Sequence, residues 1–303
     1  MANIGEPFIG TEAVAAGRFT RRTLASRNTL IYRNVYLPED AKLTPAKRAV
    51  AAWLWSDRTA TVAGRSAAAL LGSGWIEDDE PAELTRTRES ASDIVIHRDR
   101  LRDDELRELR GIPTTSPART AFDLGRRPPL RRAVAQVDAL ANATGVTAPQ
   151  VNSVLRQHKG ARGIVQLRSV VDLMDGGAES PQETHTRLVL IDAGMKRPVT
   201  QIEERNRWGH VFARIDMGWP EFKVGVEYDG PQHWTDPLRR SRDIDRYAEL
   251  AALGWILIRV NAEILYQRPW IIVERSVAAL RERGCPWLAS VRFCHASHEK
   301  AWR

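Results

Sequence analysis

Apolar and polar residues follow helical and strand periods through residues 178–280, and the pattern predicts an α/β unit. AESPQETHTRLVLIDAG predicts a helix, because Pro181 stands at its start and Gly194 at its end. Strands are predicted in GHVFARIDMGWPE, FKVGVEYDG and WILIRVNAEIL, and a helix closed by Gly254 in SRDIDRYAELAALG. The order helix, strand, turn, strand, helix, strand indicates an α/β core with a mixed sheet in the region 176–303.

The middle of the chain, residues 44–175, predicts a mixed α+β region. Helices are expected in TPAKRAVAAWLWS, GRSAAALLGSG, RRAVAQVDALANA and on both sides of the basic hinge QHKGARG. Strands are expected in ELTRT and SDIVIHR, and a turn entering a helix in IPTTSPARTAFDLG. No combination of residues typical of a catalytic site occurs in this region.

The first region, residues 1–43, predicts a winged helix-turn-helix-like reader of DNA. IGTEAVAAG and RFTRRTLAS indicate two short helices joined at Gly17 and Arg18, and Thr20 can cap the second. TLIYRNVYLPED then predicts a strand ending in a turn. Arg21 and Arg22 would lie early on the recognition helix. The alternative is a plain helical hairpin with solvated arginines.

Composition indicates ordinary globular protein with a basic surplus. The 303 residues are 43% hydrophobic and 27% charged, with a formal net charge of +7. The surplus favours double-stranded DNA as a partner, although a GC-rich coding bias would also enrich arginine. No apolar run approaches the ~18 residues of a membrane span. The first residues do not resemble a signal peptide, so a cytoplasmic protein without a membrane partner is expected. The oligomeric state stays open, with a homodimer among the alternatives.

The motif VEYDG places two carboxylates at the end of an apolar strand. Because strand residues alternate faces, Glu227 and Asp229 share a face, and a hairpin can bring Asp216 beside them. Three adjacent carboxylates raise one another's pKa, and a divalent cation removes that cost. Oxygen ligands of this kind suit Mg²⁺ or Mn²⁺, so Asp216, Glu227 and Asp229 are the predicted metal ligands. The alternative is a surface hairpin with solvated acids.

Two further residues are candidates for the same site. His233 could deprotonate a water molecule, since its ordinary pKa of ~6.5 is close to neutral. Glu183 begins the preceding helix and could point toward the carboxylates. Each has an alternative interpretation, because a lone histidine is often structural and an acid in the first helical turn is favoured by the helix dipole.

The pattern SPxE…IDMGWP…VEYDGxQH…RDxxRxxxLxxxGWxxIRV, over roughly residues 178–265, resembles the Vsr-like nuclease domain of the PD-(D/E)xK restriction-endonuclease-like superfamily. The resemblance implies a restriction-endonuclease-like core and Mg²⁺-dependent cleavage of DNA. It implies catalytic roles for the matching residues Glu183, Asp216, Glu227, Asp229 and His233. Asp243 and Arg246 match the polar pair that opens the next helix, where Arg242 and Arg246 are the candidates for DNA contact.

The sequence departs from this superfamily at one position. Asp229 stands where the motif has lysine, and Lys223 lies on the same strand face as Glu227 but four residues earlier. Vsr-like relatives also lack that lysine, and a histidine is thought to help instead. The departure leaves a second hypothesis open, a descendant that binds DNA without cutting it.

Residues 9–175 resemble, more loosely, the AbiEi-type antitoxin and regulator architecture. The resemblance rests on RNVYLPED, GRSAAALLG and GIPTTSPARTAFDLG. In that family the N-terminal unit binds promoter DNA. Two functions are therefore expected as alternatives: a Mg²⁺-dependent endonuclease-like protein of DNA repair or defence, and a non-catalytic transcriptional regulator or antitoxin with a decayed nuclease domain.

Overall fold

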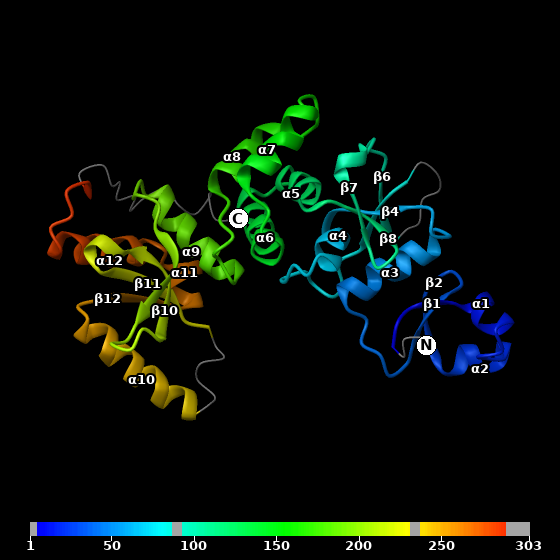
Figure 1. The fold of residues 1–303 in the computed structure, drawn as a ribbon, viewed down its shortest axis with the longest axis horizontal. Coiled ribbons are helices and arrows are strands. Elements are labelled where there is room, and N and C mark those ends of the chain that lie inside the picture. Colours follow the sequence, from blue (N-terminus) through cyan, green and yellow to red (C-terminus); the bar gives the residue numbers. More distant parts are fainter. Residues whose placement is uncertain (1–4, 87–92, 231–236, 289–303) are drawn as a thin grey trace. The chain divides into compact units, whose positions relative to one another are not determined.

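The chain divides into two compact units, Met1–Gly176 and Gly177–Arg303 (Figure 1). The computed structural model describes residues 5–86, 93–230 and 237–288, and only the backbone of residues 237–243. Both units are mixed α/β, as expected. Over these residues no helix combines the length and the apolar character that crossing a membrane requires.

The first unit begins with two short helices and a three-stranded sheet of order β1-β3-β2. Its elements are β1 (Phe8–Ile9), α1 (Gly10–Ala15), α2 (Arg21–Ser26), β2 (Asn28–Tyr32) and β3 (Val35–Pro38). Thr20 caps α2 in a capping box with Thr23, which confirms the expected cap. The single strand expected after α2 is wrong: it is a hairpin that turns at Asn34, where φ is 63°.

A five-stranded mixed sheet follows, with the order β6-β5-β4-β8-β7. The strands and helices are α3 (Pro45–Trp55), β4 (Thr61–Val62), α4 (Gly64–Leu70), β5 (Ala82–Thr85), β6 (Ile94–His97), β7 (Leu106–Leu109), β8 (Ile112–Thr115), α5 (Pro117–Gly125), α6 (Leu130–Thr144), α7 (Ala148–Gln157) and α8 (Ile164–Leu173). The segment IPTT, expected as a turn, is strand β8. Thr44 and Ser116 cap α3 and α5, so each helix begins where a side-chain oxygen accepts a backbone N–H.

One hydrophobic core joins the two sheets of the first unit. Ile9, Tyr32 and Val35 from the first sheet pack in one cluster with the alanines of α3 and with Val62 and Leu84. Small residues on α3 allow this close approach, since Ala49, Ala51 and Ala52 are fully buried. The core therefore continues across the expected boundary between residues 43 and 44.

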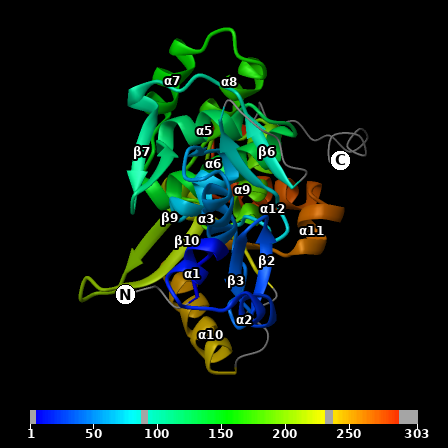
Figure 2. The ribbon, with the colours of Figure 1, turned by 90° about the vertical axis from the view of Figure 1, so that its right-hand side faces the viewer.

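The second unit is a four-stranded sheet of order β12-β11-β10-β9 with helices on both faces (Figure 1). Its elements are α9 (Pro181–Asp192), β9 (Val199–Arg205), β10 (Val211–Trp219), β11 (Val224–Tyr228), α10 (Pro237–Ala252), β12 (Ile256–Val260), α11 (Ala262–Gln267) and α12 (Trp270–Glu282). β9 was not expected; it pairs with β10 in the long antiparallel hairpin seen in Figure 2. β11 and β12 run parallel.

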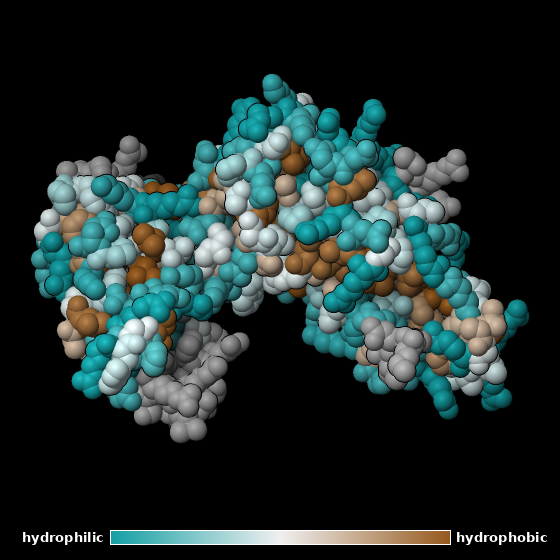
Figure 3. All heavy atoms as spheres, viewed as in Figure 1, coloured by the Kyte–Doolittle hydropathy of each residue, from teal (hydrophilic) through white to brown (hydrophobic). Residues whose placement is uncertain are grey.

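The two faces of this sheet have separate cores. On one face the residues of α9, α11 and α12 pack against Val224, Val226 and Trp219. On the other, Leu250 of α10 packs with Ile215 and Trp255. Hydrophilic residues cover most of the surface visible in Figure 3, as expected for a chain with 27% charged residues.

Gly225 allows close packing on the face of the sheet that α10 covers. A Cβ atom at this position would lie 2.7 Å from a methyl group of Leu257 and 2.8 Å from one of Ile215. These distances are too short for carbon atoms, so glycine in VGVEY allows neighbouring strands to pack over β11 just before Glu227.

Candidate functional site: carboxylates where strands β10 and β11 part

The Asp216 carboxylate lies where the ladder between β10 and β11 ends. Paired positions run from Trp219–Val224 to Met217–Val226. Beyond them the backbone N–H of Tyr228 donates to Oδ2 of Asp216 at 2.7 Å. A side-chain carboxylate thus accepts from the neighbouring strand where the regular pairing stops.

Glu227 is buried, with 5% of its surface exposed, and its carboxylate contacts α10. Arg246 donates from Nη1 to Oε1 at 2.8 Å and from Nη2 to Oε2 at 3.0 Å. The hydroxyl of Tyr247 donates to Oε2 at 2.9 Å. Arg246 and Tyr247 are adjacent residues, so a single turn of α10 provides all three donors.

Asp229 belongs to a different ion pair. Its carboxylate contacts the guanidinium of Arg259, and its backbone N–H donates to the carbonyl of Val260 at 2.7 Å. Arg259 is paired in register with Glu227 on the neighbouring strand, and its guanidinium lies 5.0 Å from the ring centre of Tyr247. The second predicted carboxylate of the motif is therefore neutralised by an arginine of β12.

Glu183 forms part of the N-terminal cap of α9. Its Oε1 accepts from the hydroxyl of Ser180 at 2.8 Å, and its Oε2 accepts from the backbone N–H of Glu179 at 2.9 Å. Gln201 of β9 donates to the same Oε2 at 3.3 Å. These contacts match the interpretation of Glu183 as a first-turn acid, and they also hold its charge near Asp216.

Three of the predicted residues interact electrostatically. Burial raises the pKa of Asp216 to about 8, and the charges of Glu183 and Glu227 add to the rise, against the lowering by the Tyr228 N–H and Arg246. Burial likewise raises the pKa of Glu183. The structure thus brings Glu183, Asp216 and Glu227 together from α9, β10 and β11. Asp229 is engaged with Arg259.

The side chains, as arranged, do not fit a divalent cation. Among the described residues, no group of three or more acidic, histidine or cysteine side chains is placed to hold a metal ion. Both Glu227 oxygens accept from Arg246, and Asp216 accepts from the Tyr228 N–H. Magnesium or manganese at Asp216, Glu227 and Asp229 stays a prediction, and it would require the arginine contacts to open.

Lys223 contacts residues on the face of the sheet that α10 covers, where the Glu227 carboxylate also lies. It precedes β11 with φ of 52°, and its Nζ lies 3.4 Å from Oε1 of Glu204 and 5.1 Å from the ring centre of Trp255. Trp255 packs with Leu250 of α10 on that face, so these contacts agree with the same-face expectation, although the lysine amine lies against Glu204. Three predicted positions cannot be compared: His233 lies outside the described residues, as do the side chains of Arg242 and Asp243.

Tyr247 and Arg259 are the site residues that sequence reasoning missed. Burial and the negative charge of Glu227 raise the pKa of the Tyr247 hydroxyl, so it stays protonated and donates. The ring also lies beside two guanidinium groups, with Arg246 4.5 Å from its centre. For Tyr247 a signal existed in RDIDRYAEL, where it directly follows the predicted Arg246, which shares a helix face with Leu250 four residues later. Arg259 had no comparable local signal.

In the first unit, a buried carboxylate holds strand β5 against helix α4. Glu83 is fully buried, and its oxygens contact Arg65 at 2.6 Å, Arg127 at 2.5 Å and His97 at 2.8 Å. Burial would raise the pKa of Glu83, but His97, Arg127 and Arg65 hold it at about 2. A Cβ at Gly64 would lie 2.7 Å from the carboxyl carbon of Glu83, too close for two carbon atoms, so glycine is needed here.

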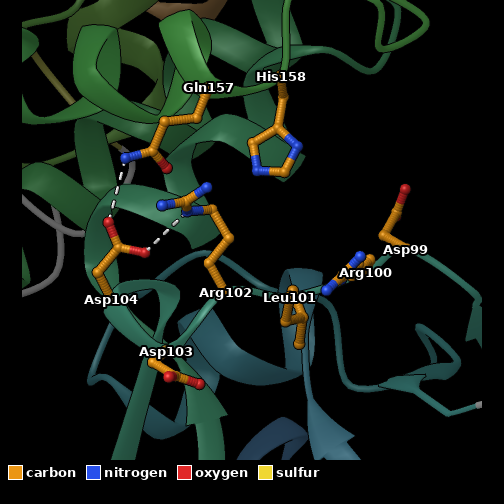
Figure 4. Close-up of a pocket in the computed structure, with 8 residues that line it drawn as sticks. All are labelled: Asp99, Arg100, Leu101, Arg102, Asp103, Asp104, Gln157 and His158. Atoms are coloured by element: carbon orange, nitrogen blue, oxygen red, sulfur yellow. Dashed lines mark hydrogen bonds and ion pairs between the residues drawn. The ribbon is translucent and has the colours of Figure 1, made fainter.

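An open cavity of about 780 Å³ lies beside this sheet (Figure 4). Asp104 links its two sides, accepting from Gln157 at 3.1 Å and from Arg102 at 3.3 Å. His158, one of the lining residues, contacts the buried Glu105 at 2.5 Å. The lining carries both signs of charge: Asp99, Arg100, Leu101, Arg102, Asp103, Asp104, Gln157 and His158.

Comparison with known proteins places a family resemblance on this part of the first unit. Residues 81–173 match the AbiEi antitoxin C-terminal domain, which here comprises strands β5–β8 and helices α5–α8. Uncharacterized proteins from two strains of Mycobacterium tuberculosis, CDC 1551 / Oshkosh and H37Rv, are each 30% identical over 170 residues, 56% of this chain. The match covers 62% of the length of these relatives.

Proposed function

We propose that the protein is a DNA-binding regulator of the antitoxin type. The observation that carries the proposal is the match of residues 81–173 to the AbiEi antitoxin C-terminal domain. It supports the regulator alternative drawn from the sequence better than the nuclease hypothesis. The helix–turn–helix and hairpin at residues 8–38, N-terminal to the matched region, would then be the DNA reader.

The charges of the reader suit a duplex backbone. Residues 8–38 carry five arginines and a single acid, Glu12, which is paired with Arg58. Arg21 and Arg22 are exposed at the start of α2, where the capping box of Thr20 fixes the first turn. Guanidinium groups at this position can contact phosphates on both sides of a groove into which α2 enters.

Binding to DNA from upstream of the protein's own gene tests this proposal. The full chain is titrated against that duplex and against a shuffled duplex of equal length and composition, at two salt concentrations and in a chelator. A regulator binds the upstream duplex at least ~1000-fold more tightly than the shuffled one. Equal affinity for the two duplexes, or no binding to either, would defeat the proposal.

A second function is favoured by the meeting of Glu183, Asp216 and Glu227 where β10 and β11 part. In a Vsr-like nuclease these residues would act on a phosphodiester bond, and cleavage would depend on Mg²⁺ or Mn²⁺. Supercoiled, linear and mismatched DNA are incubated with the protein, with magnesium and with chelator. Magnesium-dependent nicking that Glu227→Gln reduces by ~100-fold or more supports this function. A wild type that binds DNA and cuts none of the three leaves the second unit as a non-catalytic body.

A further inference from the structure

The charge of Glu227 is already compensated inside the protein. The Arg246 guanidinium meets the carboxylate with two parallel hydrogen bonds of 2.8 and 3.0 Å, and Tyr247 adds a third at 2.9 Å. The side chains are 7% exposed for Glu227 and 23% exposed for Arg246. A two-pronged arginine–carboxylate contact of this kind is the strongest and most geometrically specific of the common ion pairs.

These contacts use the positions that a cation would need. An ionised carboxylate offers about four lone-pair sites, and Glu227 has three of them occupied by N–H and O–H donors. A metal ion at Glu227 would have to replace the guanidinium, because both are cations that approach the same two oxygens. Arg246 and a divalent ion are therefore competitors for one site.

The fold holds Arg246 in this position. Leu250, one helical turn further along α10, is fully buried against the sheet and anchors the helix. The Tyr247 ring contacts two guanidinium groups, with its centre 4.5 Å from Arg246 and 5.0 Å from Arg259. The arginine is thus positioned by its own helix and by the neighbouring aromatic ring as well as by Glu227.

We propose that Arg246 is the resident cation of the carboxylate site and that it excludes divalent metal ions from Glu227 and Asp216. The residue is then neither a DNA contact nor a helper of a bound metal in the state observed. By occupying the Glu227 oxygens, Arg246 closes a carboxylate site that would otherwise be open to a metal ion. This inference does not rest on the proposed DNA-binding function, and DNA is absent from its test.

Calorimetric titration of the full chain with manganese tests the proposal. The wild type is compared with Arg246→Gln and with Arg259→Gln, a control that removes the neighbouring arginine on the same tyrosine ring. We expect no saturable binding to the wild type or the control at millimolar manganese. Arg246→Gln should bind one ion at least ~30-fold more tightly, because even in water a unit charge about 4 Å away has that effect on a divalent ion.

Thermal unfolding with and without manganese checks the result independently of heat signals. The metal should raise the Tm of Arg246→Gln and leave the wild type unchanged, since a ligand stabilises only the state that binds it. If Arg246→Gln does not fold in either condition, Arg246→Lys keeps a charge without the two-pronged contact and should show weaker gains of the same sign.

Three outcomes would overturn the proposal. The first is saturable manganese binding by the wild type that Arg246→Gln leaves equal or weakens. The second is an equal gain in Arg246→Gln and Arg259→Gln, which would indicate a general charge effect. The third is no gain in either Arg246 variant.

Discussion

Replacing Asp216 with asparagine perturbs the carboxylate site with the smallest change of shape. The asparagine oxygen can still accept the Tyr228 N–H, which reaches Oδ2 at 2.7 Å in the wild type. What disappears is a negative charge that burial and the neighbouring Glu183 and Glu227 make costly. The variant therefore isolates the electrostatic cost of this position.

The sign and size follow from the pKa. In the folded protein the pKa of Asp216 is raised from 3.8 to about 8, so the folded state holds a proton that the unfolded chain releases. The unfolding free energy of the wild type therefore falls as pH rises through this window, by up to ~1.4 kcal/mol per pH unit. Solvent reaches part of the side chain and screens it, so we expect Asp216→Asn to gain about 2 kcal/mol over the wild type between pH 5 and pH 8.

Urea unfolding of the full chain at pH 5, 6, 7 and 8, in chelator, measures this difference. Asp245→Asn is the matched control, because Asp245 is an exposed acid of the same unit on α10. The gap between Asp216→Asn and the wild type should widen as pH rises, and the control should follow the wild type. Parallel profiles for the wild type and Asp216→Asn would refute the assignment of a raised pKa to this carboxyl.

Three other substitutions have defined outcomes. Glu83→Gln should lower the unfolding free energy by about 3 kcal/mol, because it leaves Arg65 and Arg127 without their buried counter-charge. The wild type should lose the same contribution as pH falls from about 4.5 to about 2. A loss of less than about 1 kcal/mol for Glu83→Gln in urea unfolding would contradict the assignment. Thr20→Ala should cost about 1 kcal/mol through loss of the α2 cap, with Thr20→Ser as the conservative control in the same unfolding assay. Glu227→Gln should lower stability by removing the partner of Arg246 while leaving DNA affinity in chelator unchanged; a filter-binding loss would show that the carboxylate site takes part in docking.

Local signals were strong enough to predict most of the helices. Thr20, Thr44 and Ser180 each accept a backbone N–H at a helix start, and Pro181 stands in the first turn of α9. Such caps depend on a few neighbouring residues, so the sequence displays them directly. The sequence does not predict β9, because the extended conformation of VTQIEER depends mainly on its pairing with β10 at the edge of the sheet.

The carboxylates were predictable as a group, but their partners were not. Alternation along VEYDG and IDMGW indicated that Asp216 and Glu227 could approach each other, and the two charges do interact. That Arg246 would neutralise Glu227, and Arg259 Asp229, depends on how α10 and β12 pack against β11. Those contacts join residues 19 to 30 positions apart in the sequence, and no local pattern specifies them.

The salt dependence of DNA binding by the reader tests the central claim most directly. Affinity of the full chain for its upstream duplex is measured in chelator over a series of salt concentrations, for the wild type, Arg21→Ala/Arg22→Ala and the control Arg275→Ala/Arg281→Ala, which removes two exposed arginines of α12. If Arg21 and Arg22 contact phosphates, the first double variant binds more weakly and its slope of log K against log salt falls by ~2. The control should keep the wild-type slope. Equal slopes for the wild type and Arg21→Ala/Arg22→Ala would contradict a DNA reader at α2.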